Sequence, residues 1–203
     1  MRNLSIHTEE NLAKTDIKVW DILVRFFHWA LVLAFAIAYL SEDDYMTLHE
    51  WAGYTILALL GVRLVWGVVG TKYARFSNFI YPPKEITGFV KDTLSLKAKR
   101  YIGHNPAGGA MVILLMLSLL ITGLTGMSVL AIEEQQGPFV SLMSGMGEFW
   151  EDVFEEVHEF FANFTLFLVV VHIAGVLVES LIHGENLIRS MINGRKRANS
   201  ERN

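Results

Sequence analysis

The stretch VHEFFANFTLFLVVVH, residues 157–172, holds a histidine near each end of an apolar segment. From about Phe160 to Ile182 the chain is long and apolar enough to cross, as a helix, the roughly 30 Å of a bilayer's hydrocarbon. Fourteen residues take up roughly 21 Å and close to four turns of a helix, so His158 and His172 point to one side at two depths. An ionisable side chain is costly inside a span, so both positions are candidates for function.

Three further apolar blocks are about as long. They run from about Ile22 to Leu40, from about His49 to Val69 and from about Ala107 to Ala131. Hydrophobic residues make up 52% of the chain and charged residues only 19%, whereas about a quarter of a soluble domain is charged. Because a helix satisfies its own backbone hydrogen bonds in lipid, we expect an all-α protein, an integral membrane four-helix bundle.

The charged residues are sorted between the connections of these spans. All 17 Lys and Arg lie before the first span, near an end of a span, in the 71–104 connection or after the fourth span. The 41–48 and 132–159 connections contain Asp and Glu but no Lys or Arg. Cytoplasmic loops carry the excess of Lys and Arg. We therefore expect both termini and the 71–104 connection in the cytoplasm, and an acidic outer face.

Local signals indicate where the helices begin and end. Asn105-Pro106 is typical of a helix start, with a capping residue followed by proline at the first helical position. Pro82-Pro83 breaks the middle connection. EFWEDVFEEVHEFF, residues 148–161, is expected to continue the fourth span outward, and His183-Gly184 to end it. ENLIRSMINGRK, residues 185–196, is typical of a short amphipathic helix on the inner surface.

Two more histidines match the first two in depth. His28 lies about twelve residues before the outer end of its span and hence about 18 Å deep, whereas His49 opens its span at the outer surface. Depth therefore pairs His49 with His158 on the outside and His28 with His172 on the inside. Two imidazoles at one depth on facing helices provide the axial ligands that a haem iron needs.

The sequence contains no cysteine. This excludes a thiolate zinc site, a cysteine-ligated iron–sulfur cluster and the CxxCH attachment of a c-type haem. We therefore predict two haems with two histidine ligands each, held between the first, second and fourth spans and not attached through cysteine. His49 and His158 would bind the outer iron, and His28 and His172 the inner one.

Four other residues are candidates for haem binding. Gly53 and Gly175 each lie one turn after one of these histidines and would leave room for a flat macrocycle, although small residues also occur at helix contacts. Arg63 lies fourteen residues after the outer histidine of its helix, and Arg25 one turn before the inner histidine of its own. Both arginines would pair with the propionates of the inner haem. The alternative is that they reach the cytoplasmic headgroups.

Four motifs carry a resemblance to a known family. They are VWDILVRFFHWAL (19–31), LHEWAGY (48–54), YIGHNPAGG (101–109) and the VHEFFANFTLFLVVVH stretch. In this order they resemble the four-helix, di-haem, bacterial b-type cytochromes, grouped with the cytochrome b subunits of nickel–iron hydrogenases, over roughly residues 18–196. Hydrogenase subunits of this kind often have a fifth span, so the four spans here favour the shorter branch of the family.

Together with the charge pattern, the resemblance predicts three parts. These are a cytoplasmic N-terminal tail (1–19), a four-span di-haem cytochrome b domain (20–183) and an amphipathic, basic cytoplasmic C-terminal tail (184–203). The resemblance also implies that the two haems are non-covalent haem b groups. It further implies electron transfer across the bacterial cytoplasmic (inner) membrane, with electron exchange involving ubiquinone, menaquinone or a redox partner.

We expect the protein to move electrons between a periplasmic redox partner and the membrane quinone pool or an inner-side partner. The acidic outer connections would attract a redox protein with a basic docking face, or serve topology alone. No feature indicates nucleic-acid binding, and no residue stands out as catalytic. One alternative is a stand-alone oxidoreductase that reduces quinone or oxidises quinol or superoxide. Another is a non-redox four-span transporter or scaffold that uses its buried histidines for protons. The sequence leaves open whether the chain is an electron-transfer protein or the cytochrome subunit of an oxidoreductase.

Overall fold

A computed structural model describes residues 16–42, 44–143 and 145–198 of the chain. The rest of the two predicted tails, residues 1–15 and 199–203, lies outside this described part, as do residues 43 and 144. The contacts divide the chain into two compact units. Unit 1 comprises Met1–Phe26, Trp66–Gly109 and Gly175–Asn203, and unit 2 comprises Phe27–Val65 and Ala110–Ala174.

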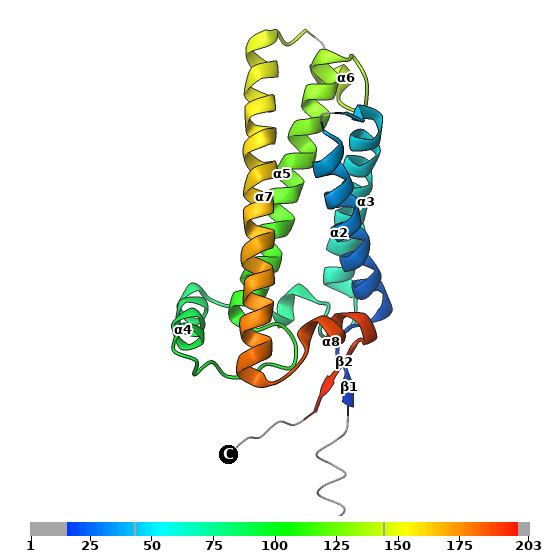
Figure 1. Cartoon of the computed structure of the whole chain (residues 1–203). Helices are drawn as coiled ribbons and strands as arrows, with labels where there is room; N and C mark the ends of the chain where they lie inside the picture. The colour runs from blue at the N-terminus through cyan, green and yellow to red at the C-terminus, as the bar shows by residue number, and fades with distance from the viewer. Residues whose placement is uncertain (1–15, 43, 144, 199–203) are drawn as a thin grey trace, which may run out of the picture. The chain divides into compact units, whose positions relative to one another are not determined.

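Four long helices dominate the fold (Figure 1). They are α2 (Ile22–Ser41), α3 (Met46–Val69), α5 (Pro106–Glu133) and α7 (Glu148–His183). All four are long and apolar enough to cross a membrane. Many of their apolar side chains face outward, as contact with lipid requires; Leu40 and Leu181 are each 82% exposed. The four predicted spans and the all-α membrane bundle are confirmed.

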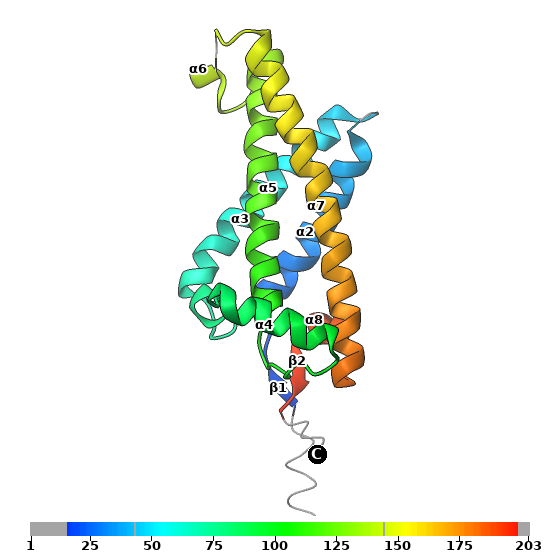
Figure 2. The same cartoon turned by 90° about the vertical axis from the view of Figure 1, so that its left-hand side faces the viewer.

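Shorter elements connect these helices or lie before the first and after the last of them (Figure 2). They are β1 (Asp16–Lys18), the 3₁₀-helix η1 (Phe76–Asn78), α4 (Pro83–Leu94), α6 (Val140–Met143), α8 (Leu187–Asn193) and β2 (Arg195–Arg197). The strands pair antiparallel, with Ile17 opposite Lys196. The two ends of the described chain therefore meet within unit 1, a pairing that the sequence did not predict.

The structure confirms two of the predicted helix ends and shows a further role for the two prolines of the middle connection. Asn105 caps α5, because its Oδ1 accepts the Gly108 N–H at 2.6 Å, and α7 ends at His183. In the middle connection, Pro82 precedes α4 and Pro83 is its first residue. A proline at this position breaks no helical hydrogen bond, because the first N–H groups of a helix have no partner within it. The two prolines thus start a helix rather than only interrupt a connection.

An apolar cluster and a buried hydrogen bond contribute to holding the helices of unit 2 together. The core cluster shared by α2, α3 and α5 contains Phe27, Ala34, Ala38, Ala52, Ile56, Leu60 and Leu119. Between α5 and α7, the hydroxyls of Ser118 and Thr165 form a buried hydrogen bond of 2.7 Å. In lipid, helices associate through close packing of their backbones and through interhelical hydrogen bonds, because the hydrophobic effect that drives association in water is missing there.

Asp21 ties the beginning of α2 to the end of α3 within unit 1. Its Oδ1 accepts the Val24 N–H at 2.9 Å. Its Oδ2 accepts the Trp66 indole N–H at 3.0 Å and the Thr71 hydroxyl at 2.6 Å. Burial acts to raise the pKa of Asp21, but these hydrogen bonds outweigh it and lower the pKa below its ordinary value. An ionised carboxylate thereby links the ends of two spans.

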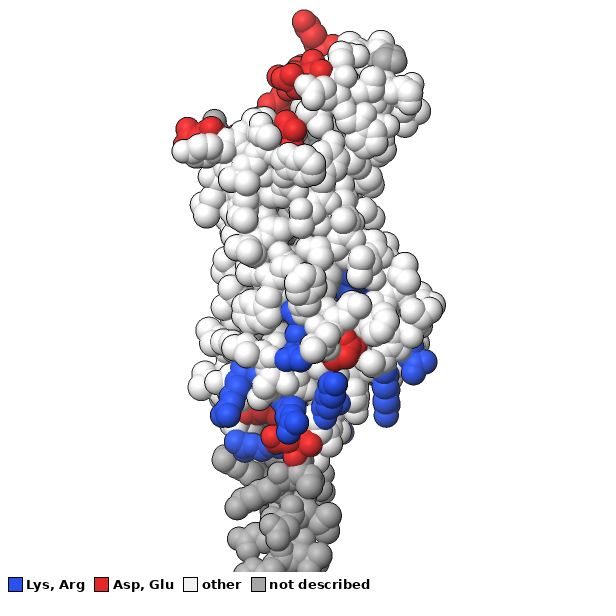
Figure 3. All heavy atoms as spheres, turned by 90° about the vertical axis from the view of Figure 1, so that its right-hand side faces the viewer, with Lys and Arg blue, Asp and Glu red and all other residues white. Residues whose placement is uncertain are grey.

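Basic residues are almost confined to unit 1, whereas acidic residues occur in both units. Arg63 is the only Lys or Arg in the sequence of unit 2, and all the others belong to unit 1. On the face drawn in Figure 3, Lys and Arg gather over unit 1 with some Asp and Glu among them, and Asp and Glu without Lys or Arg gather over the loop end of unit 2. The exposed carboxylates of unit 2, called the acidic loop face below, are Glu42, Asp44, Glu133, Glu134, Glu148, Asp152, Glu155, Glu156 and Glu159. Asp43 lies outside the described residues.

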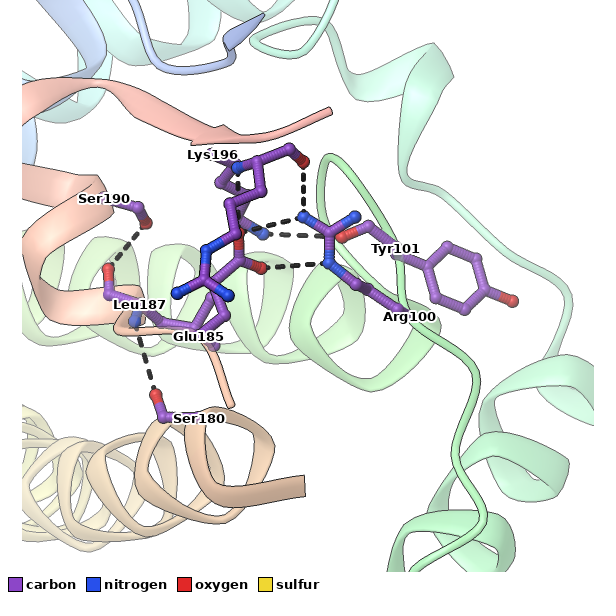
Figure 4. Close-up of polar contacts among 8 residues, drawn as sticks. Arg100, Tyr101, Ser180, Glu185, Leu187, Ser190 and Lys196 are labelled. Carbon is purple, nitrogen blue, oxygen red and sulfur yellow. Dashed lines mark hydrogen bonds and ion pairs between the residues drawn. The ribbon is translucent and has the colours of Figure 1, made fainter. Parts of the chain in front are cut away.

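Glu185 anchors the C-terminal strand of unit 1 (Figure 4). Its carboxylate accepts hydrogen bonds from Arg100 Nε at 3.2 Å and Nη2 at 2.9 Å, and from the Arg197 backbone N–H at 3.2 Å. Arg100 Nη2 also donates to the Arg197 carbonyl oxygen at 2.6 Å. Lys196, which is 7% exposed, donates to the carbonyl oxygen of Tyr101 at 3.5 Å. The network joins strand β2 to the segment that precedes α5.

The charge of Glu185 stabilises the fold at neutral pH. Burial acts to raise the pKa of Glu185, but the hydrogen bonds and charge of Arg100, together with the charge of Lys196, lower it below its ordinary value. Because the folded pKa lies below the unfolded one, ionised Glu185 adds stability at neutral pH. That contribution is lost as the pH falls through the folded pKa.

We predict that Glu185→Gln lowers the free energy of unfolding by about 2 kcal/mol at neutral pH. The difference from the wild type should shrink as the pH falls through the lowered pKa of Glu185, because the wild-type side chain then takes up a proton. Denaturant unfolding in detergent micelles, followed by circular dichroism, measures both values. Glu85→Gln makes the same change at an exposed position of α4 and should stay within about 0.5 kcal/mol of the wild type. Equal losses in the two variants would contradict the anchoring role.

Candidate functional site

The structure brings His49 and His158 together in unit 2. His49 lies near the start of α3 and His158 in α7. Their ring centres are 5.9 Å apart, and the ring planes make an angle of 67°. An imidazole nitrogen binds a metal at about 2 Å and its ring centre lies about 1 Å further away, so rings on opposite sides of one metal have centres about 6 Å apart. The observed separation fits one metal between the two rings.

In each of these two rings, one nitrogen is hydrogen-bonded to a backbone carbonyl. Nδ1 of His49 donates to the carbonyl oxygen of Ala38 at 2.9 Å, and Nδ1 of His158 to that of Thr122 at 2.8 Å. A carbonyl oxygen only accepts, so each Nδ1 carries a hydrogen and each neutral ring keeps a lone pair on Nε2. Metal-binding histidines are oriented by this kind of second hydrogen bond. In each ring, Nε2 is therefore the nitrogen that could bind a metal.

A pocket of about 450 Å³, part of it open to solvent, lies at this pair. Helices α2, α3, α5 and α7 all line it, with Phe35, Tyr39, Gly53, Ile56, Leu119 and Ala162 among the lining residues. A Cβ at Gly53 would meet no atom within 4 Å, so open space borders this residue. The sequence predicted sites between the first, second and fourth spans, and the third span, α5, lines this pocket as well.

Two glycines of α5 make room for their neighbours. A Cβ at Gly126 would lie 2.8 Å from Cε1 of His158, and one at Gly123 would lie 2.6 Å from Cδ2 of Leu57. Such contacts are too short for any real side chain, so a residue larger than glycine at 126 would displace the His158 ring. Sequence reasoning missed both positions. The available signal was the spacing of small residues in ITGLTG, residues 121–126.

His28 and His172 also come together in unit 2. Their ring centres are 6.4 Å apart and their planes make an angle of 54°, again close to the separation of about 6 Å across one metal. Trp29 packs its edge against His28 with ring centres 5.0 Å apart. Within the described part of the chain, Nδ1 of His28 is buried and has no hydrogen-bond partner. A buried nitrogen of this kind is costly, so this ring suits a bound group.

Helix α7 contributes one histidine to each pair. His158 and His172 lie on the same 36-residue helix, and their separation of fourteen residues corresponds to roughly 21 Å along the axis. The His158 ring lies beside the His49 ring, and the His172 ring lies beside the His28 ring. These are the pairs that the sequence predicted from depth in the membrane. The structure therefore contains two separate histidine pairs within one unit.

The remaining predicted site residues lie in different surroundings. Arg63 is 3% exposed in α3 of unit 2. Arg25 belongs to unit 1, where its Nη1 donates to the carbonyl oxygen of Ile192 in α8, a contact that the sequence did not predict. Gly175 also belongs to unit 1, and a Cβ added there would meet no atom within 4 Å.

Each histidine pair offers two protein ligands to a metal. Among the residues that the structure describes, no three His, Asp or Glu side chains are grouped so that they could hold a metal ion. A haem supplies the remaining ligands from its own macrocycle and accepts an axial ligand on each face. The chemistry of two imidazoles on facing helices therefore fits haem better than a free cation.

Known proteins support a b-type cytochrome. The family model described as prokaryotic cytochrome b561 matches residues 19–194. A protein of Rhizobium leguminosarum bv. viciae named "Probable Ni/Fe-hydrogenase B-type cytochrome subunit" is 24% identical, over 94% of this chain and 92% of its own length. Proteins of the same name from Azotobacter chroococcum mcd 1 and Azotobacter vinelandii are 25% and 26% identical, each over 89% of this chain and 88% of the relative. No solved structure matches the chain at a significant level.

The family match includes all four long helices and both histidine pairs. The relatives are similar to this chain over nearly their whole length, so the resemblance is not confined to one segment. The chain belongs to the prokaryotic cytochrome b561 family and is a multi-pass, haem b-containing electron-transfer protein of the bacterial inner membrane.

Proposed function

We propose that the chain binds two haem b groups, an outer one through His49 and His158 and an inner one through His28 and His172. The observation that supports this most strongly is the outer pair, in which backbone carbonyls hold both Nδ1 atoms and the ring centres lie 5.9 Å apart. When bound, each haem supplies the one-electron chemistry of its iron. The chain itself holds the imidazoles and sets the surrounding charge.

The other candidate residues have separate tasks in this proposal. Gly53 and Gly175 leave space for a flat ring beside α3 and α7, because a Cβ at either would meet no atom within 4 Å. Arg63 and Arg25 supply positive charge to the propionates of the inner haem. A guanidinium carries five N–H donors, so Arg25 keeps donors beside the one that binds Ile192.

We further propose that electrons pass between a periplasmic redox protein and the quinone pool, as ubiquinone or menaquinone, or an inner-side partner. The two ligands on α7, roughly 21 Å apart along the helix, would place the haems on the two sides of the hydrocarbon. The hydrogenase-subunit names of the relatives support a redox enzyme as partner. The acidic loop face suits a partner with a basic docking face, which it would attract over a long range.

Haem stoichiometry tests the ligand assignment. A pyridine haemochrome assay should find two haems per wild-type chain, because each histidine pair holds one iron. His158→Ala or His49→Ala should lower the content to about one, and His28→Ala or His172→Ala should do the same with the other haem retained. His7→Ala, a histidine of the N-terminal tail, is the control and should keep both. If a variant of either pair retained both haems, that pair's assignment would be wrong.

Gly126→Ala tests the space around the outer pair without removing a ligand. The added Cβ would lie 2.8 Å from the His158 ring, so the ring must move and the outer haem should be lost or show altered absorption bands. Low-temperature optical spectra and haem content measure this. Gly61→Ala in α3 is the matched control, since a Cβ there would meet no atom within 4 Å. Wild-type spectra in both variants would speak against the outer site.

Ionic strength tests the acidic loop face. The rate of electron exchange with a cationic soluble cytochrome should fall about tenfold from low to physiological salt, because screening weakens steering. Stopped-flow absorbance measures this rate. Glu155→Gln with Glu156→Gln should lower the rate at low salt and flatten its salt dependence. Glu85→Gln with Asp92→Asn removes two charges from α4 of unit 1 and should change neither. A salt-independent wild-type rate would refute docking on this face.

A further inference from the structure

Helix α4 packs against unit 1 with one side. Phe89 is 6% exposed, and the Thr93 hydroxyl donates to Oε1 of Glu179 at 3.1 Å. These two residues are four apart and therefore lie on one side of the helix. That side is buried against the protein. The rest of the helix surface therefore faces water, lipid or another molecule.

An apolar strip runs along α4 next to its buried side. Val90 is 42% exposed and Leu94 is 80% exposed, and their spacing of four residues places them in one line along the helix. Just before and just after α4 in the sequence, Ile80 and Leu96 are 64% and 70% exposed. A run of apolar side chains like this is unfavourable in water and indicates contact with an apolar phase or partner.

The charged residues of α4 lie in a definite order around the helix. Lys84 and Lys91 are seven residues apart, nearly two turns, so they share a side next to the apolar strip. Glu85 and Asp92 each follow a lysine by one residue, which places them about 100° further round, opposite the strip. All four are exposed. The order apolar, basic, acidic is that of a helix lying in the plane of a membrane interface, with lysines at the phosphates and acids in water.

The direction of α4 agrees with this placement. It lies in the connection between α3 and α5, two helices that are long and apolar enough to span the membrane, so this connection must pass along a membrane surface. Within unit 1, α4 runs across the end of α7 rather than along it (Figure 2). A helix across the end of a span lies flat on the bilayer.

We propose that α4 is an interfacial helix that binds anionic phospholipid, with Val90 and Leu94 in the lipid and Lys84 and Lys91 on its phosphate groups. The two lysines select anionic over zwitterionic lipid by charge, since each basic residue near the surface adds to the attraction. This surface is separate from the histidine pairs. The variants that test it should keep the wild-type haem content, so its failure and that of the haem assignment can be distinguished.

The first test measures the depth of α4. Because the chain has no cysteine, Leu94→Cys and Asp92→Cys each provide a single position for a nitroxide label, on the apolar strip and on the acidic side. In nanodiscs of phosphatidylcholine and phosphatidylglycerol, the label at 94 should collide more with oxygen than with a water-soluble nickel chelate. The label at 92 should show the reverse. Both positions are exposed, so neither change disturbs the core.

Two results of this test would overturn the proposal. Nickel access at position 94 equal to that at 92 would place the strip in water. Protection of position 94 from both oxygen and nickel would place it against protein, such as a second copy of the chain.

The second test measures lipid selectivity. Native mass spectrometry of protein released from nanodiscs with equal phosphatidylglycerol and phosphatidylcholine counts the lipids retained. Lys84→Gln with Lys91→Gln should lower the ratio of retained phosphatidylglycerol to phosphatidylcholine about fivefold or more. Lys18→Gln with Arg195→Gln removes two charges from the β1–β2 pair and should leave the ratio unchanged. An unchanged ratio in the α4 variant, or an equal loss in the control, would refute binding at α4.

Discussion

Hydrocarbon contains no water that could form hydrogen bonds with a polar group. This constraint explains the main polar contacts within unit 2. Its backbone groups are satisfied within helices, and Ser118 and Thr165 satisfy one another. His49 and His158 reach the carbonyls of Ala38 and Thr122. Those two contacts set the tautomer and direction of each ring as well as satisfying it. A requirement of the membrane thus also orients the two histidines that we propose as ligands of the outer haem.

Charged groups follow the same rule at the ends of the spans in unit 1. Asp21 joins the start of α2 to the end of α3 through three hydrogen bonds. Glu185 holds Arg100 and the backbone of β2. Both carboxylates are partly or largely buried, and both have their pKa lowered by partners that outweigh burial. Each network thus joins segments of unit 1 that are far apart in the sequence.

Helical periodicity made much of the site predictable. The rise of a helix separates His158 from His172 and matches their depths to those of the other two histidines, so the two pairs could be inferred before any contact was known. The hydrogen bonds to the Ala38 and Thr122 carbonyls could not be inferred from the sequence. Every residue has a carbonyl, and no side chain marks the one that accepts the hydrogen bond. Gly126 and helix α5 were missed for a related reason. A glycine that gives room to a ring looks the same in sequence as one at any helix contact.

The sequence by itself determined the four spans, the placement of the charged residues and the depths of the four histidines. These depend on hydrophobic length and on the rise per residue, which are properties of a single segment. Only the tertiary structure decided which carbonyl orients each ring, that Arg25 binds the Ile192 carbonyl, that β1 pairs with β2, and which sides of α4 are buried and exposed. Those features depend on how each element is rotated and packed against its neighbours, and rotation is set by contacts between segments far apart in the chain.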